Sequence, residues 1–124
     1  MTYLWVAIGG ALGSMARFWM TLAVASLTGP RFPWGTLAIN VIGSFVIGWF
    51  GALSGVEGRL SVPADARIFV MTGICGGYTT FSAFSLQTVE LFQAGEIAAA
   101  LLYTAGSFAL CLLGVWAGVA VGRL

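Results

Sequence analysis

Four long apolar runs dominate the sequence and limit what the chain can fold into. The runs cover residues 4–27, 34–53, 68–92 and 97–121. Each run is at least as long as the roughly 20 residues that an α-helix needs to cross the hydrocarbon core of a bilayer. Short connections that contain Gly, Pro and most of the charged residues separate the runs. The sequence therefore predicts an all-α membrane protein in which residues 1–124 form a single domain of four transmembrane helices.

The composition excludes several classes of protein. Apolar residues make up 60% of the chain and charged residues only 7%, with a net charge of +1. So few charges cannot cover the surface of a soluble domain or supply the basic field that binds nucleic acid. Histidine and lysine are both absent, which removes the commonest general base, metal ligand and Schiff-base amine. We therefore expect neither an enzyme nor a nucleic-acid-binding protein.

The third apolar run contains the sequence Gly73-Ile-Cys-Gly76-Gly77-Tyr-Thr79-Thr80 in its middle. Glycine costs about 1 kcal/mol relative to alanine inside a helix. Non-helical backbone at membrane depth survives only where protein or a water-filled cavity satisfies its polar groups. We therefore expect the third helix to be broken near mid-membrane. The glycines alone leave two explanations open, a break that exposes carbonyl groups to an ion and a kink that serves helix packing.

Glycines spaced by four residues recur along the chain, as in Gly9 and Gly13 or Gly73 and Gly77, and again near the C-terminal end of the fourth run. Such ridges allow helix backbones to approach closely in lipid. In the first and fourth runs we expect them to serve packing only. The two cysteines, Cys75 and Cys111, lie in apolar surroundings without metal-ligand spacing and are predicted to be free thiols.

A few polar side chains stand out inside the spans. Asn40 is the only strongly polar residue of the second run, and it indicates either a functional site or an interhelical hydrogen bond. After the predicted break, Phe81, Phe84, Ser85 and Thr88 recur at helical spacing, so two phenyl rings and two hydroxyl groups share one stripe. The edges of the rings carry the positive end of the quadrupole and are able to face an anion.

Two ionisable residues lie within the spans. Arg17 falls near the middle of the first run, where it must reach the interface, pair, or line water. Glu90 is two residues from the end of the third run, so we expect it to reach the membrane surface.

Three stretches together resemble the signature sequences of the Fluc (CrcB) family of fluoride channels. They are Gly9-Gly10-Ala-Leu-Gly13-Ser-Met-Ala-Arg17, Gly35-Thr36-Leu-Ala-Ile-Asn40 with Gly43-Ser-Phe45, and Gly73-Ile-Cys-Gly76-Gly77-Tyr-Thr79-Thr80-Phe81-Ser82-Ala-Phe84-Ser85. The order and spacing of the motifs, the four spans and the length all agree with the family. The resemblance covers the whole chain.

The resemblance implies specific roles for individual residues. Phe81 and Phe84 would provide ring edges to a fluoride pore and Asn40 an amide donor. The carbonyl groups of Gly76 and Thr79 would bind a structural sodium ion. Hydroxyl donors along the pore would come from Thr80, Ser82, Ser85 and Ser107. Arg17 and Glu90 match family positions without a defined role, and Cys111 stands where some members have a hydroxyl residue.

At the level of the assembly, the resemblance implies an antiparallel, dual-topology homodimer in the bacterial inner membrane, with the sodium ion at its centre. Such a channel passes fluoride passively and exports it to relieve toxicity. The charges permit both orientations: Arg59, Arg67 and Arg123 lie on one side of the membrane and Arg31 on the other, which is a weak bias. Neutral donors also suit a channel, because an ion site must admit the ion and release it.

The residues suggest two other functions. A drug/proton antiporter of the small multidrug resistance type also has four spans in a chain of about this length, but it needs a membrane-embedded carboxylate, and only Glu90, near a helix end, is available. A non-transporting helix-bundle scaffold would agree with the glycine ridges but would leave Asn40 and the Phe–Ser stretch unexplained.

Overall fold

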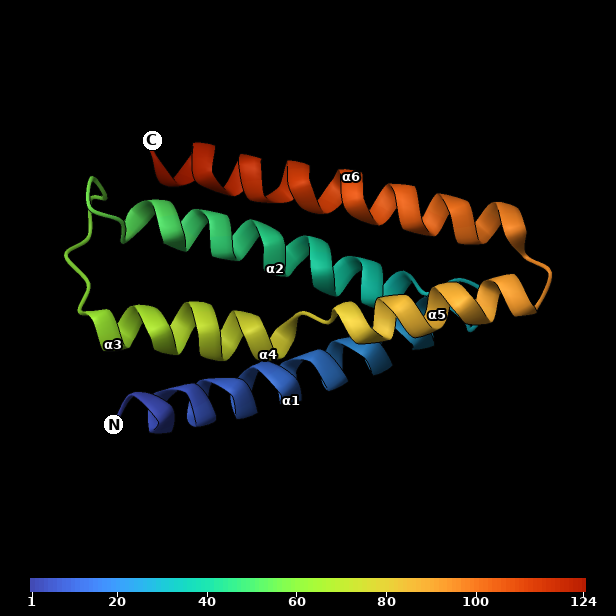
Figure 1. The fold of residues 1–124 in the computed structure, drawn as a ribbon, viewed down its shortest axis with the longest axis horizontal. Coiled ribbons are helices and arrows are strands. Elements are labelled where there is room, and N and C mark those ends of the chain that lie inside the picture. The colour runs from blue at the N-terminus through green and yellow to red at the C-terminus, as the bar shows by residue number, and fades with distance from the viewer.

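The computed structural model describes all 124 residues, and every regular element in it is helical. Four lengths of helix run back and forth beside one another (Figure 1), so that both termini and the α2–α3 connection lie at the same end of the bundle. The elements are α1 (Thr2–Thr28), α2 (Trp34–Leu53), α3 (Ala64–Arg67), the π-helix η1 (Ile68–Cys75), α4 (Gly76–Tyr78), α5 (Phe81–Gln93) and α6 (Ile97–Gly122).

Four helical stretches are long and apolar enough to cross a membrane: Thr2–Thr28, Trp34–Leu53, Ala64–Gln93 and Ile97–Gly122. Many of their large apolar side chains point outward, including Phe18, Leu102 and Trp116, which are 66%, 70% and 72% exposed. A water-soluble protein does not present such a continuous apolar surface. The surface suits lipid, as the hydropathy of the runs predicts.

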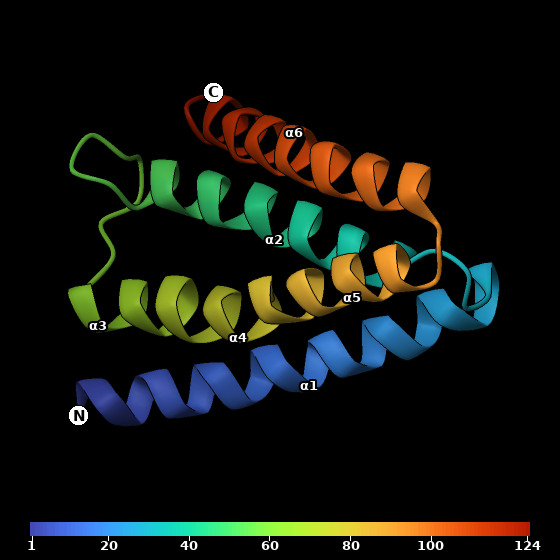
Figure 2. The ribbon, with the colours of Figure 1, turned by 45° about the vertical axis from the view of Figure 1, so that its right-hand side comes forward.

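Positive-φ glycines stand next to the loops at one end of the bundle. Gly29 follows α1 with φ 78°, and Gly95 lies between α5 and α6 with φ 79°. Residues with a Cβ rarely adopt a positive φ, which is why glycine stands at both positions. The two turns send α2 and α6 back along the bundle (Figure 2).

Close glycine contacts hold the helices together, as predicted for the first and fourth runs. On α1, Gly9 faces η1 so closely that a Cβ on Gly73 would lie 2.9 Å from the Cα of Gly9. On α6, Gly118 has no room for a Cβ because the carbonyl group of Phe45 on α2 occupies the space. Backbones that approach this closely gain dispersion contacts along their length, which is the main attraction between helices in lipid.

The third span is interrupted, and the interruption lies slightly later than the glycines suggested. Gly73, Gly76 and Gly77 are all helical, whereas Thr79 and Thr80 are extended, with ψ 159° at Thr79 and φ −152° at Thr80. The glycines instead carry the contact with α1. The glycines therefore serve helix packing, and the chain breaks at the two threonines. Exposure of carbonyl groups to an ion stays a prediction.

Candidate functional site

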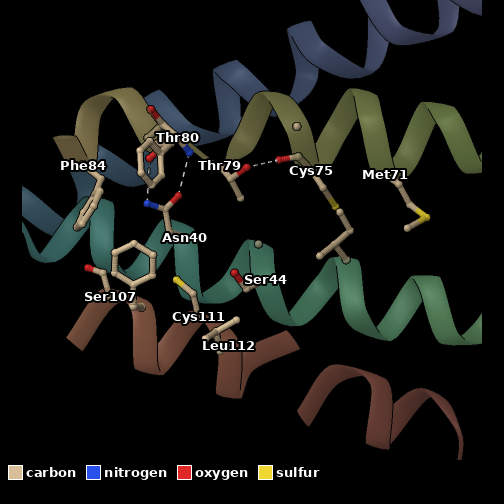
Figure 3. A pocket seen from close by; sticks show the side chains of 15 residues that line it. Asn40, Ser44, Met71, Cys75, Thr79, Thr80, Phe84, Ser107, Cys111 and Leu112 are labelled. Atoms are coloured by element: carbon tan, nitrogen blue, oxygen red, sulfur yellow. Dashed lines mark hydrogen bonds between the residues drawn. The ribbon is translucent and has the colours of Figure 1, made fainter. Parts of the chain in front are cut away.

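A cavity of about 340 Å³ lies beside the break, between α2, the third span and α6 (Figure 3). Its wall contains no ionised side chain; the polar groups are amides, hydroxyls, thiols and backbone. Five of the residues predicted to line a pore and both predicted cation ligands are among the lining residues. The full lining set is Asn40, Gly43, Ser44, Ile47, Met71, Cys75, Gly76, Thr79, Thr80, Phe81, Phe84, Ser107, Phe108, Cys111 and Leu112.

Asn40 binds the backbone at the break through both ends of its amide. Its Nδ2 donates to the carbonyl oxygen of Thr80 at 3.0 Å, and its Oδ1 accepts from the amide nitrogen of Thr80 at 2.8 Å. These bonds replace two that an uninterrupted helix would have supplied, which is what buried backbone requires. The interhelical hydrogen bond considered for Asn40 therefore exists, and one hydrogen of its Nδ2 remains beyond the Thr80 contact.

Thr80 also caps the helix that follows the break. Its Oγ1 accepts from the amide nitrogen of Ala83 at 3.1 Å, in the manner of an N-cap residue, and lies 3.3 Å from the hydroxyl oxygen of Ser82. On the other side of the break, the carbonyl oxygen of Cys75 accepts from both the amide nitrogen and the hydroxyl of Thr79. The break is thus ordered by side chains on both sides.

This arrangement changes the surroundings of two carbonyl groups. In a continuous α-helix the amide of Thr80 would donate to the carbonyl of Gly76, and the amide of Ala83 to the carbonyl of Thr79. Here the first amide donates to Asn40 and the second to the Thr80 hydroxyl. The carbonyl of Thr79 accepts no backbone hydrogen bond. The two carbonyls that lose their α-helical donors are those of the two predicted cation ligands.

Aromatic rings close one end of the cavity. Phe84 is 7% exposed and contacts three rings, with centroid distances of 5.5 Å to Phe81, 5.1 Å to Tyr103 and 6.0 Å to Phe108. Phe81 is 69% exposed on the single chain although it lines the same cavity. The cavity wall is therefore open on the side of Phe81.

Ser107 on α6 is the one buried polar side chain without a partner. Its Oγ makes no hydrogen bond although the residue is only 6% exposed, and it lines the cavity. A buried hydroxyl without a partner loses roughly 1–3 kcal/mol of solvation. Such a group is suited to donating a hydrogen bond to something that enters the cavity.

The structure places four other predicted residues outside this wall. Ser85 donates to the carbonyl of Phe81 at 2.9 Å, and Ser82 is exposed beside Thr80. Arg17 is half-buried on α1 and lines neither of the two main cavities. Glu90 is exposed and lines a second cavity of about 380 Å³ near the α1–α2 connection. Their predicted roles stay predictions.

Several residues of the site had not been singled out from the sequence. Ser44 and Phe108 line the first cavity, while Gln87 lines the second. Tyr103 lies between the two cavities: its ring contacts Phe84 and its hydroxyl donates to Gln87 Oε1 at 2.8 Å. A signal existed on α6, because Tyr103, Ser107 and Cys111 recur every four residues and so share one helix face.

The fold and cavity together define a polytopic α-helical membrane protein with a broken central helix. Residues 4–119 match the sequence profile of the family described as CrcB-like protein, Camphor Resistance (CrcB), and the chain belongs to this family. A similar protein from Methylocella silvestris, named fluoride-specific ion channel FluC, is 58% identical over 95% of this chain and 90% of the relative. Proteins with the same name from Rhodospirillum rubrum and Paramagnetospirillum magneticum are 54% and 52% identical, each over 95% of this chain and 92% of the relative.

Proposed function

We propose that this protein is a passive, fluoride-selective ion channel that acts as an antiparallel homodimer in the bacterial inner membrane and exports fluoride. The observation that carries the proposal is the cavity at the break, where neutral donors and aromatic ring edges meet in the absence of ionised side chains. The names of the relatives support the identity of the ion.

Fluoride is small and holds its water strongly, so a site that strips the water must replace it with close hydrogen-bond donors. The free Nδ2 hydrogen of Asn40 and the unpartnered hydroxyl of Ser107 are such donors. The edges of Phe81 and Phe84 add a weak positive potential. A fixed positive charge would hold the anion too firmly for release, which favours conduction through neutral groups. The residues conduct an ion and catalyse no reaction.

A pathway for the ion would continue from the first cavity past Phe84 and Tyr103 to the second cavity. The second cavity is lined by Arg31, Glu90 and Gln87 beside the α1–α2 connection, at one end of the bundle. An arginine at such a mouth would attract an anion before it is dehydrated. The aromatic contact of Phe84 with Tyr103 would then be the narrow section between two wider ones.

A second copy of the chain would complete the cavity. The exposed ring of Phe81 and the exposed backbone of Gly76 both belong to the cavity wall. In opposite orientations, two copies could bring their breaks together near the membrane centre. Carbonyl oxygens suit a hard cation, and the carbonyls of Gly76 and Thr79 have lost their α-helical donors. The residues therefore fit a structural sodium ion, which would neutralise these dipoles and hold the two breaks together.

Efflux from liposomes tests the function. Protein reconstituted alone should release fluoride down its gradient, as measured with a fluoride electrode, and should exclude chloride. Phe84→Ile should slow the efflux, while Phe92→Ile, on the same helix but outside both cavities, serves as the matched control. Equal permeation of chloride would overturn the selectivity, a strict requirement for a proton gradient would indicate an antiporter, and no flux at all would favour a scaffold.

Labelling of a single cysteine near the C-terminus tests the two orientations. In a Cys75→Ala, Cys111→Ala background, an impermeant reagent applied to intact cells should modify about half of the protein, because the arginine bias is weak. The remainder should react only in opened membranes. Labelling confined to one side would contradict the antiparallel arrangement.

A further inference from the structure

We infer that Asn40 and Thr80 are positioning residues for the cation site, because each diverts one amide hydrogen from one of the two carbonyl groups that would bind sodium. The inference rests on the proposed function, since that function includes the sodium ion. It assigns to Asn40 a task that is separate from contact with the anion.

The first diversion is made by Asn40. The amide of Thr80 donates to Asn40 Oδ1 at 2.8 Å and is thereby unavailable to the carbonyl of Gly76. The return bond from Asn40 Nδ2 to the carbonyl of Thr80, at 3.0 Å, fixes the amide plane in this position. Without the asparagine, the amide of Thr80 would be a buried donor with Gly76 as its natural acceptor, one helical turn earlier.

The second diversion is made by the hydroxyl of Thr80. It accepts from the amide of Ala83 at 3.1 Å, so the carbonyl of Thr79 accepts no backbone hydrogen bond. Thr80 is itself 8% exposed, which protects this bond from competition with water. If the hydroxyl were missing, the amide of Ala83 could extend α5 backward and take the carbonyl of Thr79.

Thr80 takes part in both of these hydrogen bonds, so it would help to position the cation site as well as line the proposed anion path. Asn40 reaches the cavity from α2 and holds the backbone of Thr80, which directly follows Thr79 (Figure 3), and Gly76 and Thr79 line the same cavity as Asn40. Groups that orient metal ligands from behind typically change metal affinity by about 10- to 100-fold when removed. We expect changes of this size here.

Sodium binding can be read out without any measurement of transport. The purified full-length protein is unfolded thermally in detergent over a series of sodium chloride concentrations, with N-methylglucamine chloride holding the ionic strength constant. A ligand that binds only the folded state stabilises it by an amount that grows with the logarithm of the ligand concentration once this exceeds the Kd, so the unfolding temperature rises as sodium is added. Asn40→Leu and Thr80→Val should each require about 10- to 100-fold more sodium for the same rise.

Two controls separate positioning from a general effect of mutation. Thr80→Ser keeps the capping hydroxyl, and Ser107→Ala removes a cavity hydroxyl that makes no hydrogen bond to the break; both should retain wild-type sodium dependence. If Asn40→Leu does not fold, the nearly isosteric pair Thr80→Val and Thr80→Ser decides the matter.

The outcomes distinguish the inference from the proposal that it rests on. If the wild-type protein shows no sodium dependence, the proposed cation site is wrong and the inference fails with it, whereas fluoride efflux remains a separate test of the channel. If the wild type responds to sodium and Thr80→Val responds equally well, the cation site stands and the positioning role is overturned. A loss confined to Thr80→Val and Asn40→Leu supports the inference.

Discussion

The two halves of the third span pack by opposite means. Before the break, η1 and α4 lie against α1, where glycines on both helices bring backbone onto backbone. After it, α5 lies against α6, and the contact is made by the rings of Phe84, Tyr103 and Phe108. The first half is stabilised by close contact between helix backbones, and the second by contact between large buried side chains.

The difference explains why a cavity exists at the junction. A helix packed closely through glycines leaves no space, and a helix packed through rings is held away from its neighbour. Where one mode gives way to the other, around Thr79 and Thr80, the third span separates from α2 and α6 enough to leave a cavity. Asn40 bridges the junction from α2 to the backbone of Thr80, so a mostly apolar cavity wall carries a polar group at this point.

The largest loss of stability is expected from adding a single methyl group in the glycine contact. A Cβ on Gly13 would collide with the carbonyl of Ile74 and lie 2.8 Å from the amide nitrogen of Tyr78. Because every colliding atom belongs to backbone, which cannot move aside as a side chain can, we expect a cost above the usual figure of about 1–3 kcal/mol for overpacking, against a gain of about 1 kcal/mol in helix propensity. Gly13→Ala should therefore lower the free energy of unfolding in detergent.

The neighbouring Gly10→Ala is the matched control, because nothing lies within 4 Å of a Cβ at that position. It should be neutral or slightly stabilising. Equal effects of the two substitutions would mean that close backbone contact with α1 does not stabilise the first half of the third span.

The aromatic half should be more tolerant, and its two phenylalanines should differ. Phe84→Ile loses close ring contacts with Tyr103 and Phe108, at about 0.5–1.5 kcal/mol each, so a destabilisation of about 1–3 kcal/mol is expected together with slower fluoride efflux. Phe81→Ile loses only its ring contact with Phe84 and should slow efflux with a smaller loss of stability.

Unfolding and electrode measurements on the same preparations separate the two effects. If a Phe81→Ile protein keeps the proposed dimer and wild-type efflux, that ring is not part of the proposed pore. If Phe84→Ile left the stability unchanged, the ring contacts would not be what holds the second half.

Much of this organisation could be predicted from the sequence because it follows from patterns along the chain. Hydropathy predicted the four spans, and the four-residue spacing of Gly9 and Gly13 predicted a packing ridge. The exact position of the break could not be predicted, because glycine is permissive rather than disruptive. Gly76 and Gly77 stay helical, and the extended conformation at Thr79 and Thr80 depends on Asn40, some 40 residues earlier in the chain.

Several residues of the cavity wall were predicted from the sequence, but their hydrogen bonds were not. Asn40, Phe84 and Ser107 were identified, yet nothing in the sequence says that both ends of the asparagine amide bind Thr80. The link between Tyr103 and Gln87 was missed for the same reason, since a contact between two helices has no local signal.

Removing the hydroxyl of Tyr103 should have a modest effect that sharpens the comparison. Tyr103→Phe keeps the ring against Phe84 and deletes the 2.8 Å bond to Gln87, so about 1 kcal/mol of stability should be lost. This is less than the loss expected for Phe84→Ile, as it must be if rings rather than hydrogen bonds hold α5 to α6. Chemical denaturation of the two variants side by side makes the comparison, and the reverse order would contradict it.

The smallest effect on stability is expected at Ser107, which lines the cavity from α6. Its hydroxyl has no partner, so Ser107→Ala removes a group that was desolvated without compensation. The free energy of unfolding should therefore change by no more than about 1 kcal/mol, and we expect it to increase. Efflux should nevertheless fall, because the proposed path loses a donor. Cys111→Ala, one turn along α6 and also in the cavity wall, is the matched control for loss of a small side chain. A stability loss of several kcal/mol in Ser107→Ala would show that the hydroxyl has a structural partner, and unchanged efflux would show that fluoride does not pass it.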